Sequence, residues 1–114
     1  MEAERSVAVI SVPGDRSDGD MEAFGKLAAR TFDRLVIRED DNTRGRKRGE
    51  ISGILRDSAV SAGIAEDRVS IVLDELEAVK AAVGMSSKTE LVVLMVDKPA
   101  EVWEMLTSIG AAAV

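Results

Sequence analysis

Two runs of almost unbroken apolar residues constrain this chain more than any other feature of its sequence. SVAVISV covers residues 6–12 and ELVVLMV covers 90–96, and the shorter runs RLVIR and RVSIVL cover 34–38 and 68–73. A strand with one face in water alternates apolar and polar residues, whereas these runs hardly alternate. They therefore predict strands that are covered on both faces, as in a parallel sheet between two layers of helices.

The stretches between these runs have the spacing of amphipathic helices. We expect the first helix to begin after Asp18 or Asp20 as its N-cap, and the second to end just before Gly63. The third is expected to begin at Asp74 and the last at Pro99. The order β-α-β-α-β-α-β-α predicts an α/β fold, a three-layer, open and mostly parallel sheet flanked by helices.

One domain accounts for the whole chain. Its 114 residues suit a single domain, and no internal repeat or low-complexity linker divides them. We expect one domain over residues 1–114, with an ordered core from about 6 to 109. Helical spacing predicts that Leu27 in the first helix, Leu76, Val79 and Val83 in the third and Trp103 in the last face the core.

The residue types that are missing exclude several functions. The chain has no cysteine and no histidine, which excludes thiol catalysis, serine–histidine hydrolysis and zinc sites built on these ligands; we expect no metal site. The net charge of −6 argues against a nucleic-acid partner. The longest apolar run, residues 91–96, is far shorter than the ~20 residues of a membrane span. Without a signal-peptide pattern at its start, the chain is expected to be cytoplasmic and free of the membrane.

Charged residues gather after each predicted strand. Asp15 and Arg16 follow the first strand, residues 39–47 the second, 74–75 the third and 97–101 the fourth. The carboxyl ends of parallel strands lie at one edge of a sheet, where α/β proteins bind their ligands. Carboxylates mixed with guanidinium groups suit a zwitterion or a nucleotide. For any one of these loops alone, helix capping and solvated surface charge are the better explanation, but not for the loops after the first and second strands taken together.

Four motifs taken together resemble the C-terminal domain of the Mur ligase superfamily. They are PGDRSD, REDDNTRGRKRGE, LDELEAV and DKPAEVW, in this order and spacing, and the resemblance covers about residues 7–106. Within that superfamily the sequence is most similar to the cyanophycin synthetases. These ligases activate a carboxyl group with ATP and join it to an amino group, releasing ADP and phosphate. The resemblance implies a Rossmann-like lid domain that is truncated at its N-terminus.

The resemblance also implies roles for individual residues, none of them catalytic in the isolated chain. Asp15 and Arg16 are similar to residues that bind the nucleotide in Mur ligases. The loop at 40–44 resembles the substrate loop of relatives that add diaminopimelate, with Thr43 in place of a proline. The implied substrate-binding residues are Arg16, Asp40, Asp41, Asn42, Arg44 and Glu101.

A phosphate-binding loop is missing from the sequence. The segment from Gly14 to Gly19 is followed by Asp20 and Met21, where a P-loop needs Lys and then Ser or Thr. The resemblance therefore implies that ATP and Mg²⁺ are bound only together with a separate central domain, which would be a partner of this chain. It also implies an amino-acid substrate, with arginine as a candidate.

Two other interpretations are left open by the sequence. The chain could be a stand-alone module that binds an amino acid or a nucleotide, or a protein-interaction module without catalysis. An uncovered sheet edge would also favour a homo-oligomer.

Overall fold

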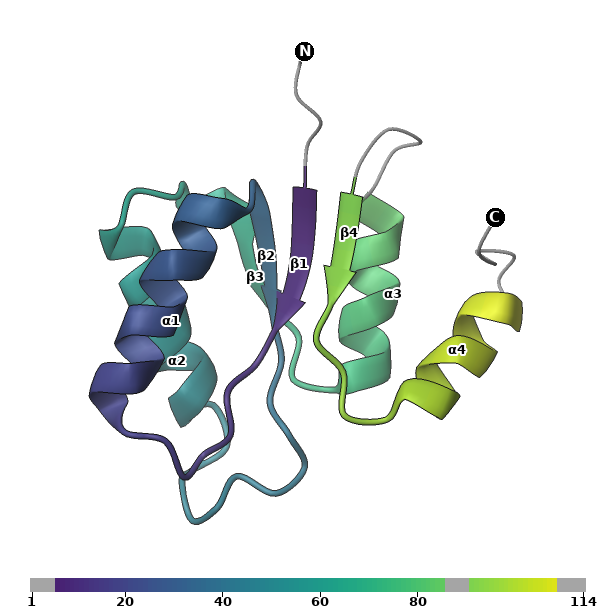
Figure 1. Cartoon of the computed structure of the whole chain (residues 1–114), viewed down its shortest axis with the longest axis horizontal. Coiled ribbons are helices and arrows are strands. Elements are labelled where there is room, and N and C mark those ends of the chain that lie inside the picture. The colour runs from purple at the N-terminus through teal and green to yellow at the C-terminus, as the bar shows by residue number, and fades with distance from the viewer. Residues whose placement is uncertain (1–5, 86–90, 109–114) are drawn as a thin grey trace.

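The chain folds as a four-stranded parallel sheet between helices (Figure 1), which confirms the predicted α/β class. In this computed structural model, residues 6–85 and 91–108 are described. The strands are β1 (Ser6–Ile10), β2 (Arg34–Ile37), β3 (Val69–Ile71) and β4 (Leu91–Leu94), in the spatial order β3-β2-β1-β4. The helices are α1 (Asp18–Thr31), α2 (Glu50–Ser61), α3 (Glu75–Met85) and α4 (Pro99–Ser108), with a 3₁₀ turn at Glu66–Arg68.

The central strand β1 is buried on both faces, as its unbroken apolar run predicts. Val7 and Val9 pack in one cluster with residues of α3, while Ala8 and Ile10 pack in another with α1 and α2. These four residues expose 1% of their surface or less. The helices therefore form two layers, α1 and α2 on one face of the sheet and α3 on the other, with α4 beside α3 (Figure 1).

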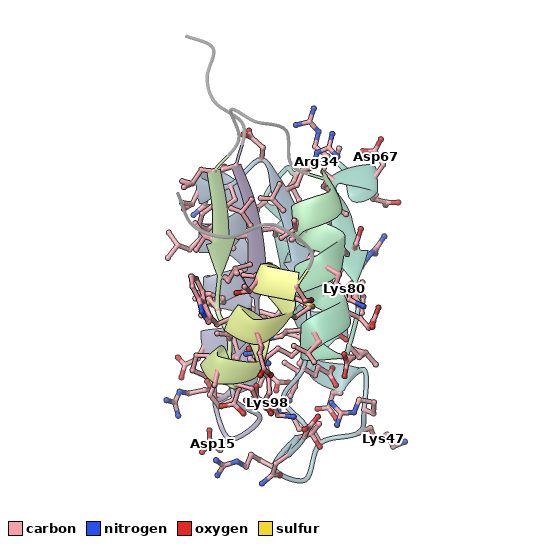
Figure 2. The ribbon with its side chains drawn as sticks, turned by 90° about the vertical axis from the view of Figure 1, so that its right-hand side faces the viewer. Asp15, Arg34, Lys47, Asp67, Lys80 and Lys98 are labelled. Carbon is pink, nitrogen blue, oxygen red and sulfur yellow. The ribbon has the colours of Figure 1, made fainter. Side chains whose placement is uncertain are left out.

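Parallel pairing places all four carboxyl ends at one edge of the sheet. The register is given by the pairs Val7–Arg34, Ser6–Leu91 and Leu35–Val69. Figure 2 shows the labelled side chains of Asp15, Lys47 and Lys98 at this end of the molecule, and those of Arg34 and Asp67 at the opposite end. We call the end with the strand carboxyl termini the rim.

The helices begin and end close to the expected residues, but the cap of α1 differs. Its N-cap is Ser17, whose Oγ accepts the backbone N–H of Asp20 at 3.0 Å. The prediction of Asp18 or Asp20 is wrong because both lie inside the first turn, where carboxylates favour the positive end of the helix dipole. Gly63 follows α2 with φ +114°, as expected. Helix α3 begins one residue after the expected Asp74, whose carboxylate accepts the backbone N–H of Glu77.

Two side chains expected in the core lie on the surface instead. Leu27 is 58% exposed and Trp103 is 57% exposed. In α1 the buried residues include Met21 and Ala28, so Leu27 lies on the flank of the helix. Among the described residues of α4, only Val102 is buried.

The buried face of α3 is shifted from the predicted one. Val79 is buried as predicted, but Leu76 and Val83 are only partly buried, and Ala78 and Ala82 are buried instead. Small alanines let the helix lie close to the sheet, and the larger side chains then sit beside the contact. No helix within the described ranges 6–85 and 91–108 has the length and apolar content needed to cross a membrane.

The contact between α1 and α2 depends on a glycine. A Cβ atom added at Gly25 would collide with the hydroxyl of Ser58 and lie 2.9 Å from the carbonyl oxygen of Leu55. The Ser58 hydroxyl is itself held, donating to the carbonyl of Ile54 at 2.8 Å. The two helices are therefore as close as a bare backbone allows.

We expect Gly25→Ala to lower the free energy of unfolding by about 1–3 kcal/mol, the usual cost of overpacking. Gly53→Ala is the matched control, because no atom lies within 4 Å of a Cβ built there. In that helix interior the alanine should be neutral or stabilise by up to about 1 kcal/mol. Urea denaturation with unchanged m-values measures both. Equal effects at the two positions would contradict the close packing.

Candidate functional site

Three charged side chains are buried at the rim. Arg38, Glu39 and Glu75 expose only 3%, 2% and 7% of their surfaces. Arg38 and Glu39 directly follow β2, and Glu75 is the first residue of α3. A buried charge costs several kcal/mol unless it is paired and hydrogen-bonded, so the partners of these groups define the local structure.

Arg38 joins the ends of two strands and a helix. Its Nε donates to the carbonyl oxygen of Met95, just after β4, at 2.9 Å. Its Nη1 contacts Asp40 at 2.7 Å and Glu75 at 3.3 Å. Because these partners come from the loops after β2 and β4 and from the start of α3, one guanidinium fixes the spacing of these three segments.

Glu75 continues this network toward α4. Its two carboxylate oxygens accept the backbone N–H groups of Asp97 and Lys98 at 2.9 and 2.8 Å. The Nζ of Lys98 then contacts Asp41 at 2.7 Å across the rim. The hydrogen bond from Lys98 and its charge lower the pKa of Asp41, and the same contact raises the pKa of Lys98.

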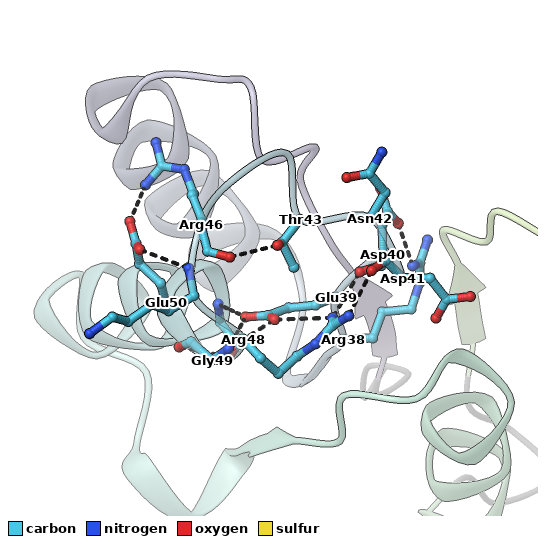
Figure 3. A network of polar contacts seen from close by, with 12 residues as sticks. Arg38, Glu39, Asp40, Asp41, Asn42, Thr43, Arg46, Arg48, Gly49 and Glu50 are labelled. Atoms are coloured by element: carbon cyan, nitrogen blue, oxygen red, sulfur yellow. Dashed lines mark hydrogen bonds and ion pairs between the residues drawn. The ribbon is translucent and has the colours of Figure 1, made fainter.

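Glu39 caps helix α2 from a distance of ten residues (Figure 3). The N-cap of α2 is Gly49, which has no side chain to offer. The Glu39 carboxylate accepts the N–H of Gly49 at 3.0 Å and that of Ser52 at 2.8 Å, and it contacts Arg48 at 3.3 Å. Burial raises the pKa of Glu39, but these hydrogen bonds and the Arg48 charge outweigh it, so the pKa lies below its usual value.

A small acidic cavity lies between the loops that follow β2, β3 and β4. Its volume is about 70 Å³. The carboxylates of Asp97 and Glu101 have no hydrogen bond or ion pair with any described residue. The lining residues are Arg38, Glu39, Asp40, Asp41, Asp74, Glu75, Leu76, Asp97, Lys98 and Glu101. Because carboxylates outnumber cations, the cavity suits an ammonium or guanidinium group better than an anion.

A second, more basic group lies where the β1–α1 loop meets the β2–α2 loop. The carboxylate of Asp15 contacts Arg16 at 3.2 Å and Arg44 at 3.7 Å. Both guanidinium side chains are 55% exposed. Nearby, Arg46 contacts Asp18, and this hydrogen bond is the main cause that raises the pKa of Arg46. Exposed guanidinium groups held in this way can receive a carboxylate or a phosphate.

The residues predicted from the sequence thus fall into two groups on the same rim. One group is Asp15, Arg16 and Arg44, and the other is Asp40, Asp41 and Glu101. Asn42 joins neither, since its Oδ1 accepts the backbone N–H of Arg44 at 2.9 Å and so shapes the loop. What these residues bind stays a prediction.

Sequence reasoning missed the residues that hold the rim together. Arg38 was not singled out, and Glu75 was placed only among the charged residues that follow the third strand, although an arginine that directly follows a buried strand is an available signal. Arg46 gave no such signal, because two of its partners lie 30 and 32 residues earlier. Within 6–85 and 91–108, no group of three or more acidic side chains is placed to hold a metal ion.

Comparison with known proteins shows clear relatives by sequence. No family model matches the chain. Cyanophycin synthetase from Crocosphaera subtropica is 42% identical over 88 residues, which is 77% of this chain and 10% of that protein. The cyanophycin synthetase from Trichormus variabilis is 37% identical over 89 residues, 78% of this chain and 10% of the relative. The cyanophycin synthetase from Synechocystis is 33% identical over 103 residues, which is 86% of this chain and 11% of that protein. The chain therefore spans about a tenth of the length of these relatives.

A solved structure shares the fold. Folylpolyglutamate synthase from Mycobacterium tuberculosis, complexed with ADP and AMPPCP, matches with a TM-score of 0.57 and 19% identity. The match covers 93% of this chain and 24% of that enzyme. At this identity the likeness concerns the fold alone, an α/β arrangement of a parallel sheet and helices.

We expect Glu39→Gln to lower the free energy of unfolding at pH 7 by about 1–3 kcal/mol. The amide has one acceptor oxygen, whereas both carboxylate oxygens of Glu39 accept backbone N–H groups at the N-terminus of α2. The pKa of Glu39 is lowered in the folded state, so its stabilisation is complete above the unfolded pKa and is lost as the pH falls through the folded one. The difference between wild type and variant should therefore shrink below roughly pH 4.3, the ordinary pKa of a glutamate.

Denaturation curves from pH 3 to 8 test this, with Glu66→Gln as control. The Glu66 carboxylate is 73% exposed in a loose pair with Arg56 at 3.8 Å, so its loss should have little effect. A Glu39 effect that does not change with pH would contradict the capping role.

We expect Arg38→Met to lower the free energy of unfolding by about 3–5 kcal/mol, because Glu75 would keep a buried charge without its guanidinium. The double variant Arg38→Met, Glu75→Gln should cost less than the sum of the two single changes. Arg34→Met, at the opposite end of β2 and without an ion pair to any described residue, is the control. Additive effects in thermal or urea unfolding would show that the Arg38–Glu75 pair does not couple.

Proposed function

We propose that this chain, a relative of the cyanophycin synthetases with a Mur-ligase-type α/β fold, is the C-terminal domain of an ATP-dependent, ADP-forming amide ligase. In this role it acts as a lid that helps to bind the nucleotide and receives the incoming amino acid, in the cytoplasm. The observation that carries the proposal is the 42% identity to cyanophycin synthetase over 88 residues. Because the chain spans a tenth of such relatives, a separate ATP-binding central domain is its proposed partner.

The geometry of the rim supports different roles for its two groups, one binding the cationic part of a ligand and the other its anionic part. The acidic cavity has two carboxylates without a hydrogen bond or ion pair to any described residue, Asp97 and Glu101, which suit the amine or the cationic side chain of an amino acid such as arginine. Arg16 and Arg44, both half exposed, suit its carboxylate or a phosphate. A zwitterionic substrate would find both charges matched on one rim.

ATP and Mg²⁺ would supply the phosphoryl group and neutralise its charge. Asp15 and Arg16 are the residues of this chain proposed to contact the nucleotide. Mg²⁺ is proposed to be bound together with ATP at the central domain, as the resemblance to the ligases implies. This chain alone is then proposed to be inactive, because positioning across both domains is needed.

The second candidate is a module that binds a small molecule or a protein without catalysis. Exposed apolar side chains, Trp103 on α4 and the 59% exposed Leu91 on β4, favour contact with a protein. Calorimetric titration of the isolated chain with arginine, aspartate and ATP separates the two candidates. Tight binding to the isolated chain favours a stand-alone module, whereas binding only beside a central domain favours the ligase.

We expect Arg16→Ala to reduce turnover by about tenfold or more in a cyanophycin synthetase whose matching stretch is replaced by this chain, the loss of one charge-assisted hydrogen bond. Release of ADP that depends on arginine measures the turnover. Circular dichroism should be unchanged, because Arg16 is exposed on the rim.

Arg30→Ala, an exposed arginine in the last turn of α1, removes the same charge away from the rim and should leave turnover unchanged. A folded hybrid enzyme that releases no ADP would contradict the ligase role. Equal activity in the Arg16 and Arg30 variants would contradict the assignment of Arg16.

A further inference from the structure

Arg46 lies on the rim with a largely covered side chain, and its guanidinium has four partners in the protein. Its Nε donates to the carbonyl oxygen of Gly14 and its Nη2 to that of Arg16, both at 2.8 Å. Its Nη1 contacts Asp18 at 2.8 Å and Glu50 at 2.7 Å. With 16% exposure its guanidinium is largely taken up by the protein, unlike the half-exposed guanidinium groups of Arg16 and Arg44.

The two carbonyls that Arg46 binds flank Asp15 on both sides. Holding the oxygens of residues 14 and 16 on one planar group fixes the path of the β1–α1 loop through Asp15. The same loop touches the β2–α2 loop through its backbone. A Cβ atom at Gly14 would collide with the carbonyl oxygen of Thr43, so the loops meet without a side chain between them.

A tight turn directs Arg46 back toward the β1–α1 loop. The backbone N–H of Arg46 donates to the carbonyl of Thr43 at 3.2 Å, and the Thr43 hydroxyl donates to the carbonyl of Arg46 at 2.6 Å (Figure 3). Between them, Arg44 has φ +56° and Gly45 has φ +93°. A non-glycine residue with positive φ is held there by its surroundings at some cost in strain. The turn therefore fixes the backbone positions of both Arg44 and Arg46.

We propose that Arg46 is a positioning residue, which clamps the β1–α1 loop to the β2–α2 loop and so holds Arg16 and Arg44 as one anion-binding pair about Asp15. The inference rests on the proposed function in one respect, that this pair receives the phosphate or carboxylate of a ligand. Arg46 itself does not touch the anion. Its role is to fix the distance between the two groups that do.

A lysine cannot replace Arg46 in this role. The planar guanidinium donates in three directions at once, to two carbonyls and to a pair of carboxylates, whereas an ammonium is a compact point charge. Arg46→Lys therefore keeps the charge and removes the geometry. Lys47→Ala is the matched control, since it removes a unit charge from the adjacent residue, which is exposed.

The test uses the 114-residue chain labelled with ¹⁵N and titrated with pyrophosphate at constant ionic strength, followed by NMR. We expect Arg46→Lys to weaken pyrophosphate binding by about tenfold, the loss expected when one charge-assisted hydrogen bond is misplaced. Lys47→Ala should weaken it by only about twofold, as the loss of a screened surface charge does. The amides of residues 14–18 and 43–46 should become more mobile in Arg46→Lys, with the remaining amides unchanged.

Gly14→Ala approaches the same junction from the other loop and changes no charge. It should also weaken pyrophosphate binding. If Arg46→Lys does not fold, Gly14→Ala is the variant that is compared with wild type. A wild-type chain that binds no pyrophosphate would overturn the anion-binding pair. Binding by Arg46→Lys within about twofold of wild type, or a larger loss in Lys47→Ala, would overturn the positioning role.

These outcomes are separate from those of the ligase assay. A chain that binds pyrophosphate in a manner dependent on Arg46, but does not restore ADP release in the hybrid enzyme, refutes the proposed ligase role and leaves the clamp intact. A hybrid enzyme that works equally well with Arg46→Lys refutes the clamp and leaves the ligase role intact.

Discussion

The buried guanidinium of Arg38 is the interaction on which the rest of the rim depends. It binds the backbone after β4 and the carboxylates of Asp40 and Glu75, so it joins the loops after β2 and β4 to the start of α3. A charge so deeply buried is tolerated only when its donors are satisfied. The loops are therefore held where the guanidinium needs them, and the small cavity between them follows from this spacing.

Charged side chains at the rim serve two different ends. The buried ones are Arg38, Glu39 and Glu75. They form hydrogen bonds with backbone groups and ion pairs with other side chains, and so they stabilise the structure. The exposed ones, such as Arg16 and Glu101, keep donors or acceptors that a ligand can use. This separation agrees with how binding sites work in general, since groups held in place before binding lose less entropy when the ligand arrives. A rigid frame thus presents a few free charges.

The sequence predicted much of the site but not its internal order. The gathering of charge at one rim follows from the positions of Asp15, Asp41 and Glu101 after separate strands, and the structure places these loops together. It did not show that Asn42 shapes its own loop or that Arg46 reaches the backbone of the first loop. Two residues of the same type and the same loop, Arg44 and Arg46, differ only in where their side chains point. That direction is decided by a turn with positive φ, which the sequence RGR does not reveal.

The sequence by itself determined the layers of this protein, because a strand that is buried on both faces needs apolar residues at consecutive positions. Every residue from Val7 to Ile10 is apolar, and every one of these residues is buried in the structure. Only the tertiary structure decided which charges are structural and which are free. The carbonyl bound by Arg38 lies 57 residues along the chain, and the cap of α2 comes from Glu39, ten residues before Gly49. Such contacts leave no periodic pattern in the sequence, since they form only when folding brings distant loops to the same edge of the sheet.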